Sequence, residues 1–314
     1  DLAAGLHTLS NLTQLRICDY NVGDAAADLA SALTHLPALK TLKLAYTEVQ
    51  GEGARALCHA LRSCTALEQL LLSPTDWMPD DPDDFANADK FRGSVGRNII
   101  LRDAGSELAA SLAACPKLRV LALEDLLLTA DDGAQLGAVL RACGQSLEHL
   151  ILRDYMVLPE AAERLSETLG CCTALTSLAC WYCRIETDEE YDGFNALVEA
   201  LEKLPALQHL FLAETDCALD FDTFLRMLHF PTLRHATLNL AVPDCSELAR
   251  FQALLCARGC ALSSLRIHLY STSSAMSDAE HAQVRAAVHT MTAACDGILD
   301  LDVVLPYECR RSWS

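Results

Sequence analysis

The amino-acid sequence predicts an α/β solenoid, in which short strand–helix units follow one another along the chain. The first observation is a self-match: residues 1–12 read DLAAGLHTLSNL, residues 28–39 read DLASALTHLPAL, and six positions are identical at an offset of 27. The second is an L-x-x-L-x-L pattern or a close variant of it, which starts at residues 12, 39, 67, 118, 147, 175, 207, 233, 262 and 298. Most of its steps lie near 28 residues, so about 10 repeats are expected.

Each of these short segments alternates in steps of two, which is typical of a half-buried strand. The segment that follows the second one, residues 51–64, instead has apolar residues three and four positions apart and predicts a helix. Leu-Pro, Cys-Thr or Cys-Gly pairs at 36–37, 64–65, 143–144 and 204–205 mark the ends of such helices. The repeat is therefore strand, loop, helix and loop.

Strand–helix–strand units in series predict parallel strands with right-handed crossovers. Helices are about 10 Å wide and strands lie about 4.8 Å apart, so helices on one face force the sheet to curve. We expect a horseshoe with a parallel β-sheet on the concave face and α-helices on the convex face.

These repeats resemble leucine-rich repeats of the ribonuclease-inhibitor type, whose units have 28–29 residues and full convex helices. The resemblance covers nearly the whole chain and implies a concave face that binds proteins. That family often carries Asn or Cys three residues after the last strand Leu. Here the position holds residues such as Tyr20, Thr47 and Tyr155, so the repeats are divergent.

The charge of the chain narrows the choice of partner. Its 314 residues include 43 acidic and 24 basic ones, and the net charge is −19. Nucleic acids and anionic membranes are polyanions, so neither is expected as a partner. No apolar run approaches the roughly 18 residues of a membrane span.

Several of the 15 cysteines share one position of the repeat. Cys64, Cys115, Cys172 and Cys295 each lie three residues before the first Leu or Ile of the next repeat, where Leu36, Leu204 and Phe230 stand elsewhere. A position that accepts Cys, Leu or Phe is a buried apolar slot, in which free Cys packs as a small hydrophobe. Reduced thiols indicate a cytoplasmic protein. The resemblance adds the cytoskeleton or axoneme as one expected setting, because scaffolds found there also have this fold.

Two features raise the question of a metal or redox site. Cys180 and Cys183 form a C-x-x-C pair, but Cys180 replaces a core Leu and no second pair completes four ligands, so a core role is favoured. His149, His209 and His235 share one inward column, in which His209 and His235 lie on neighbouring strands; a metal site, a pH-responsive pair or plain polar surface are the alternatives. Catalytic motifs are absent from the sequence, so we expect no enzyme, no cofactor and no metal.

The concave face supplies the candidate binding residues. Its middle positions, from Arg16 and Lys43 to Arg266, form an apolar stripe with basic ends, and the next positions add aromatic and charged residues. Exposed apolar surface rimmed by charge typically marks a protein-binding site. The predicted partner-binding residues of this face are Leu71, Glu124, Ile151, Arg153, Asp154, Trp181, Tyr182, Phe211 and Glu214. The alternative is that some of them fill a narrow groove without any partner.

An acidic insertion at about 73–103 interrupts the repeats. Asp residues surround Trp77 and Phe85, which complete the predicted partner-binding set. The segment is interpreted as a docking arm for a basic partner, with a flap packed over the repeats or a calcium site as alternatives.

The sequence favours a non-enzymatic scaffold or adaptor made of a single domain, residues 1–314, that binds a protein partner within a larger complex. The resemblance leaves two alternatives open: a GTPase-activating protein of the leucine-rich-repeat type, or the sensor or substrate-binding part of a larger receptor or ubiquitin-ligase adaptor. Because residues 1–12 resemble the end of a helix, we expect the numbering to begin inside a preceding repeat of a longer protein. Self-association is not predicted either way.

Overall fold

The structure is a computed structural model that describes residues 5–18, 22–45, 47, 49–72, 100–128, 130–157, 159–181, 184–185, 192–213, 221–241, 250, 262–270, 282, 286, 289 and 300–304. The chain divides into two compact units. Unit 1 contains residues 1–176 and 186–204, and unit 2 contains residues 177–185 and 205–314.

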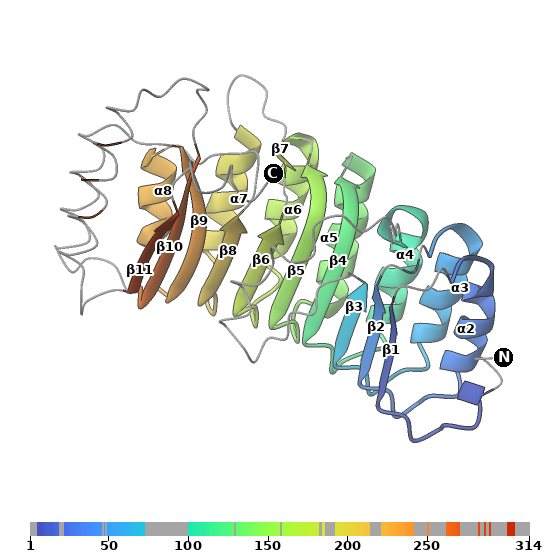
Figure 1. Cartoon of the computed structure of the whole chain (residues 1–314). Helices are drawn as coiled ribbons and strands as arrows, with labels where there is room; N and C mark the ends of the chain where they lie inside the picture. The colour runs from blue at the N-terminus through green and yellow to red at the C-terminus, as the bar shows by residue number, and fades with distance from the viewer. Residues whose placement is uncertain are drawn as a thin grey trace. The chain divides into compact units, whose positions relative to one another are not determined.

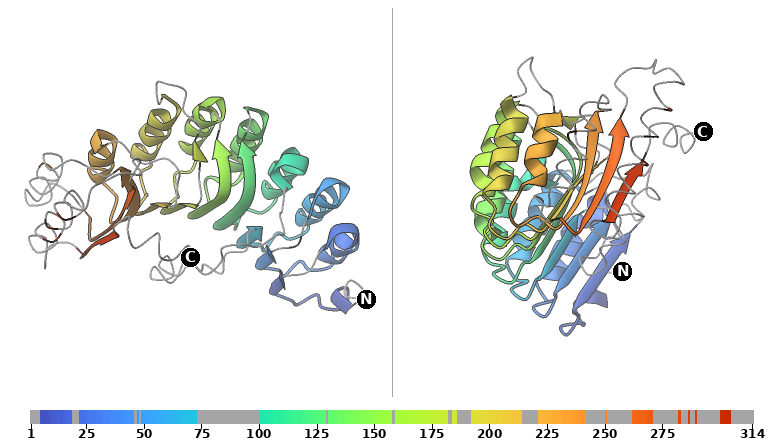
Figure 2. Two further views of the ribbon diagram at one scale, coloured as in Figure 1. Left: turned by 45° about the horizontal axis from the view of Figure 1, so that its top comes forward. Right: turned by 90° about the vertical axis from the view of Figure 1, so that its left-hand side faces the viewer.

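Unit 1 alternates strands and helices. Its strands are β1 (Gln14–Cys18), β2 (Thr41–Ala45), β3 (Gln69–Leu72), β4 (Val120–Leu128) and β5 (His149–Val157), and each pairs in parallel with the next. Its helices are η1 (Gly23–Ala25), α2 (Ala26–Leu33), α3 (Gly51–Leu61), α4 (Ile100–Leu112), α5 (Ala130–Cys143), α6 (Pro159–Leu169) and α7 (Asp192–Glu202). Helices α2 to α7 pack against one another in chain order, on one face of the strands (Figures 1 and 2). In each unit, we call the face of the sheet opposite its helices the open face.

Unit 2 repeats the same pattern. Its strands are β6 (Ser177–Trp181), β7 (Arg184–Ile185), β8 (His209–Ala213), β9 (His235–Ala241), β10 (Ser264–Tyr270) and β11 (Asp300–Val304), and its described helix is α8 (Phe221–Leu228). Strands β6, β8, β9, β10 and β11 pair in parallel in that order. The predicted α/β class, with a parallel sheet and helices between successive strands, is confirmed.

The leucines of the repeat form the core, as their spacing predicts. In β2, Leu42 and Leu44 are 0 % exposed, and in α3 Leu57 and Leu61 are each 1 % exposed. Burial of a side chain of this size contributes about 1.5–3 kcal/mol. The slot at the helix end is equally dry, with exposed fractions from 0 % to 3 % at Leu36, Cys64, Cys115, Cys172, Leu204 and Phe230. The predicted apolar slot is therefore confirmed at these positions.

Backbone hydrogen bonds fix the register between successive repeats. The carbonyl oxygen of Thr13 accepts N–H bonds from Lys40 and Thr41 at 2.8 and 3.0 Å. The carbonyls of Lys40, Glu68 and Arg119 repeat this double contact with the next repeat. Each doubly bonded carbonyl belongs to the residue after the first Leu of its repeat. A one-residue slip would reverse the two faces of a strand, so this ladder helps to keep the leucines inward.

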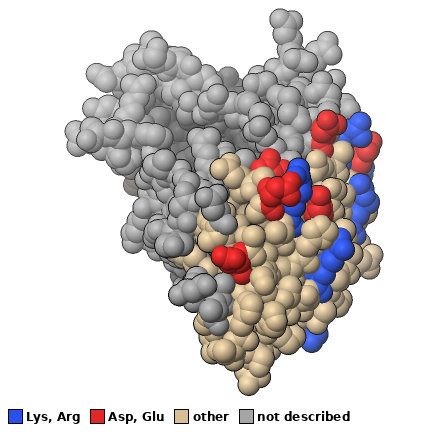
Figure 3. Space-filling model, turned by 90° about the vertical axis from the view of Figure 1, so that its right-hand side faces the viewer, with Lys and Arg blue, Asp and Glu red and all other residues tan. Residues whose placement is uncertain are grey.

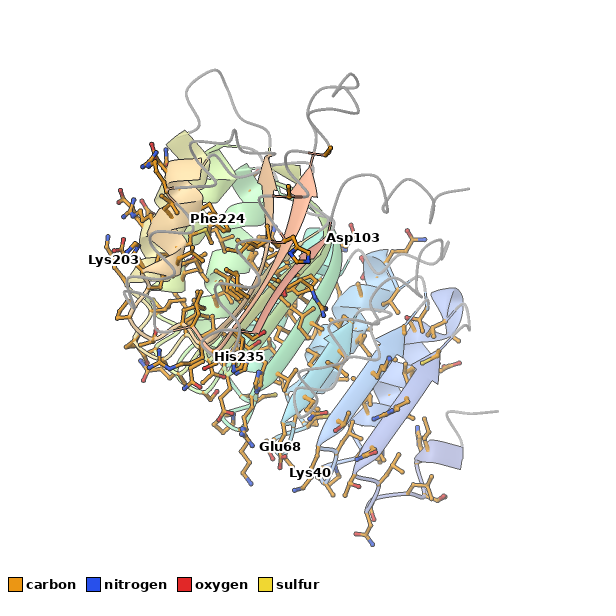
Figure 4. All side chains as sticks on the ribbon, turned by 60° about the vertical axis from the view of Figure 1, so that its left-hand side comes forward. Lys40, Glu68, Asp103, Lys203, Phe224 and His235 are labelled. Carbon is orange, nitrogen blue, oxygen red and sulfur yellow. The ribbon has the colours of Figure 1, made fainter. Side chains whose placement is uncertain are left out.

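The N-terminus of α3 is tied to α4. Gly51 has a φ of +57°, a conformation that favours glycine, and its N–H donates to Oδ2 of Asp103 at 2.6 Å. Close packing continues two residues later, because a Cβ at Gly53 would lie only 2.6 Å from the Cβ of Ala26 in α2. Asp103 therefore caps a helix of the neighbouring repeat (Figure 4).

Helix α4 begins at Ile100, so the last four residues of the predicted insertion belong to this helix. Its backbone is non-helical at Ala104, where φ is −148° and ψ is 30°. The rest of the insertion, residues 73–99, lies outside the described residues. The extent of the insertion and the single-domain organisation stay predictions.

Candidate protein-interaction surface

The open face of unit 1 brings two predicted binding residues close together. Leu71 of β3 is in register with Ala122 of β4, which is in register with Ile151 of β5. The three side chains are 2 %, 0 % and 0 % exposed. This central part of the predicted stripe is thus apolar, as expected, but it is not exposed in the structure.

In unit 2, the residues at the same middle position of each strand also lie side by side on the open face. Phe211 of β8 is in register with Ala179 of β6 and with Thr237 of β9, and Thr237 with Arg266 of β10. Phe211 is 6 % exposed, whereas Thr237 and Arg266 are half-buried. The accessible part of this row is therefore polar and basic.

The other predicted binding residues fall into two groups. Glu124 of β4 is in register with Arg153 of β5, and Asp154 and Trp181 lie on β5 and β6, but the structure does not describe these four side chains. The second group lies outside the described residues and consists of Trp77, Phe85, Tyr182 and Glu214. Partner binding by the whole set stays a prediction.

Exposed apolar surface is scarce among the described residues. Of the large hydrophobic side chains placed there, Leu9 is the exposed one, at 47 %. Single exposed hydrophobic residues are common on proteins and do not mark a binding site. Accessible recognition groups on the described open face are thus polar, in contrast to the exposed apolar stripe that the sequence predicts.

Polar residues occupy the first open-face position of most strands. In unit 1, the hydroxyl of Thr41 donates to Oε1 of Gln69 on the next strand at 3.2 Å. In unit 2, His209 and His235 are register partners, and their rings stack with centroids 4.6 Å apart and planes 7° apart. The predicted proximity of these two histidines is confirmed, and the stack is their most specific feature.

A row of alternating charges lies just before the strands of unit 1 begin, and Figure 4 labels two of its members, Lys40 and Glu68. Lys40 pairs with Glu68 at 3.0 Å, and Arg119 with Glu148 at 2.5 Å. The hydrogen bond from Arg119 lowers the pKa of the Glu148 carboxyl. These pairs are largely exposed and contribute at most about 1 kcal/mol each. This row is absent from the residues predicted above, although its signal is present in the sequence: the residue after the first Leu alternates in sign over four repeats.

The two basic positions at the start of the predicted stripe differ in exposure. Arg16 of β1 is exposed, whereas Lys43, its register partner on β2, is 2 % exposed. Figure 3 shows one face of the molecule on which acidic and basic side chains lie beside one another within a mainly uncharged surface. Contacts such as Arg55 with Glu52 and with Glu107 illustrate this mixing. The described residues of that face show no field of a single sign, which fits a protein partner better than a polyanion.

Burial keeps the described core thiols protonated. Desolvation raises the pKa of Cys58, Cys64, Cys143 and Cys172 from the ordinary value of 9.0 to about 12, and that of Cys115 to about 11. Cys18 and Cys171 are exposed, and Cys180 is a buried free thiol. Cys180 therefore has the core role that the sequence favours, while Cys183 lies outside the described residues.

We expect iodoacetamide at pH 8 to label Cys18 and Cys171 at least tenfold faster than the five core thiols, since only the accessible thiolate reacts. The measurement is peptide mass spectrometry of native protein, with urea-unfolded protein as the control in which all thiols react. Labelling of Cys64 or Cys115 at the rate of Cys171 would contradict the buried slot.

The raised pKa values also predict how the free energy of unfolding depends on pH. Because unfolded thiols lose their protons near pH 9 and the core thiols only near 11–12, the free energy of unfolding should fall as the pH rises through this window.

The described residues contain no group of three or more His, Cys, Asp or Glu side chains that could hold a metal ion. Among the helices that are described, none combines the length and the apolar character needed to cross a membrane.

Comparison with known proteins agrees with the repeat architecture. No protein-family model matches the chain. Over 237 residues it is 27 % identical to the NACHT, LRR and PYD domains-containing protein 9 of Bos taurus, in a match that covers 63 % of this chain and 23 % of that protein. The chain thus spans less than a quarter of the relative it matches. Together with the parallel strands and the helices between them, this likeness supports an α/β leucine-rich-repeat solenoid and a role in protein–protein interaction.

Proposed function

We propose that the chain is a non-enzymatic scaffold or adaptor that holds a protein partner on the open face of its sheet, with the acidic insertion as a second contact. The observation that carries the proposal is the architecture itself. Repeated parallel strands present row upon row of side chains on one face, while the helices of unit 1 cover the other. Such a surface is suited to recognition, and solenoids commonly use it for binding.

The exposed groups of the described open face are polar, and the proposal combines them with two aromatic residues that the sequence predicts. Accessible side chains of the described open face include Arg16 in unit 1 and Thr237, Arg266 and the two stacked histidines in unit 2. Trp181 and Phe211 lie on the neighbouring strands β6 and β8, where Trp181 is in register with Ala213. Aromatic and Arg residues dominate the energetics of most protein interfaces, so these positions are the proposed centre of binding in unit 2.

The likeness to the bovine protein favours one particular setting. Its name combines NACHT, LRR and PYD domains, and the match covers 23 % of its length. We infer that the present chain serves as the sensor or substrate-binding part of a larger protein. Reduced core cysteines fit the proposed cytoplasmic location, with a cytoskeletal or axonemal complex as one place to look.

The test is capture of the partner by the whole protein, followed by mass spectrometry. We expect Trp181→Ala with Phe211→Ala to reduce recovery of the principal partner at least tenfold, because loss of two aromatic contacts typically removes 2 kcal/mol or more from binding. The matched control is Glu202→Ala with Lys203→Ala, two exposed residues at the end of α7. Circular dichroism and thermal unfolding establish that both variants fold. Equal recovery by a folded double variant and the wild type would refute binding through this part of the open face.

A further inference from the structure

The stacked histidines of unit 2 are the most specific polar arrangement on the described open face. His209 begins β8 and His235, which is labelled in Figure 4, begins β9. Their rings are almost parallel, 7° apart, with centroids separated by 4.6 Å. Both side chains are half-buried, so solvent and a ligand can reach them.

The side chains around the stack are known from the strand register. Ser177 of β6 and Ser264 of β10 stand on either side of the pair, and Phe211 and Thr237 follow two residues along the same face. Arg266 of β10, beside Thr237, is the nearest charged position of the described face, and Asp300 and Asp302 of β11 are in register with Ser264 and Arg266. The guanidinium of Arg234, next to His235 in sequence, donates to the carbonyls of Pro231 and Leu233.

Parallel imidazoles are poorly arranged for a metal ion. The lone pairs of ring nitrogens lie in the ring planes, and two planes only 7° apart direct them side by side instead of toward one point. Two nearby imidazoles instead form an arrangement that is sensitive to protons. Two unit charges about 4–5 Å apart repel each other even in water, which disfavours the doubly charged state about fivefold or more. A negatively charged group placed beside the rings would remove that repulsion.

We propose that the His209–His235 stack, together with Arg266, is a proton-controlled binding site for a carboxylate side chain on an acidic segment of a protein partner. Histidine is the side-chain type whose charge ordinarily changes between about pH 5 and 8, so added protons would place positive charge on the pair beside the permanent positive charge of Arg266. This inference deepens the proposed function, because it gives the chemistry of the segment that the open face of unit 2 recognises.

The test uses the whole chain with tetraglutamate as the probe and tetraglutamine as the uncharged comparison, followed by NMR at pH 5.5 and pH 8.0. We expect tetraglutamate to bind at least about tenfold more tightly at pH 5.5, and tetraglutamine to bind at neither pH. His235→Phe keeps an aromatic ring in the stack but cannot be protonated, and His209→Gln removes one ring. Both variants should reduce the pH effect to less than about twofold, whereas Arg266→Gln should weaken binding at both pH values.

The matched control is His35→Phe. His7 and His35 form a second stack, with centroids 4.4 Å apart, in unit 1, so the control removes the same chemistry elsewhere. It should leave the binding of tetraglutamate unchanged. A wild-type protein that does not bind the probe at pH 5.5, or a pH effect that survives in both His235→Phe and His209→Gln, would overturn the proposed site. Because partner capture by the Trp181 and Phe211 variants is measured separately, failure of this site and failure of the proposed function give different results.

Discussion

Replacement of Phe224 by alanine should lower the free energy of unfolding by about 3–5 kcal/mol, one of the two largest effects expected for a single substitution in this protein. Phe224 lies in α8 and is 0 % exposed, with Met227 and Leu228 of the same helix also at 0 %. Helix α8 packs against β9, so a cavity at this position would remove packing contacts from the apolar layer between helix and sheet in unit 2. The side chain is labelled in Figure 4.

The measurement for Phe224 is urea unfolding of the whole chain, monitored by hydrogen exchange in peptides from β8 to β10. Arg226→Ala is the control, because Arg226 is an exposed residue of the same helix, and exposed substitutions usually cost less than about 0.5 kcal/mol. If Phe224→Ala costs no more than Arg226→Ala, the assignment of this helix face to the core is wrong.

Cys115→Asp should destabilise unit 1 by about 4 kcal/mol or more, because it places a carboxylate where no charge can be solvated. Cys115 is 1 % exposed. Its Sγ lies 3.5 Å from the carbonyl oxygen of Leu61, 3.7 Å from that of Cys64 and 3.6 Å from that of Ser111. A thiol can donate weakly to these acceptors, whereas an ionised carboxylate would be repelled by all three.

A short substitution series separates charge from size at this position. Cys115→Ser keeps a donor and should cost least, Cys115→Ala should cost about 1–2 kcal/mol, and Cys115→Asp most. Thermal unfolding at pH 7 provides the ranking. Equal melting temperatures for the Asp and Ala variants would show that position 115 is accessible to water, against the buried slot derived from Cys64, Cys115 and Cys172.

The fold was predictable because the same strand and helix pattern recurs in successive repeats of the sequence. The spacing of the leucines predicts the strands, and the presence of Leu36, Cys64 and Phe230 at one repeat position predicts that the slot is apolar. The proximity of His209 and His235 followed in the same way, since residues at equal repeat positions of adjacent strands become neighbours. The orientation of their rings depends on side-chain torsions that no sequence spacing contains.

Exposure was the property that the sequence predicted poorly. Alternation assigns Leu71 and Ile151 to the open face, but a side chain's exposed fraction depends on everything packed around and above it. Both are almost fully buried, and so is Lys43, whose charge would lead one to expect exposure. The alternating charges of Lys40, Glu68, Arg119 and Glu148 lie just before each strand, outside the alternating positions from which the inward-facing residues are predicted.

Photo-crosslinking tests the central claim, recognition through the open face, most directly. A benzoylphenylalanine residue placed at Thr237, on the open face of unit 2, is compared with one at His229, an exposed residue just after α8. We expect the partner captured by the whole protein to crosslink at position 237 and not at position 229. Crosslinking at position 229 without crosslinking at position 237 would place the partner on the helical side and contradict the proposed binding face.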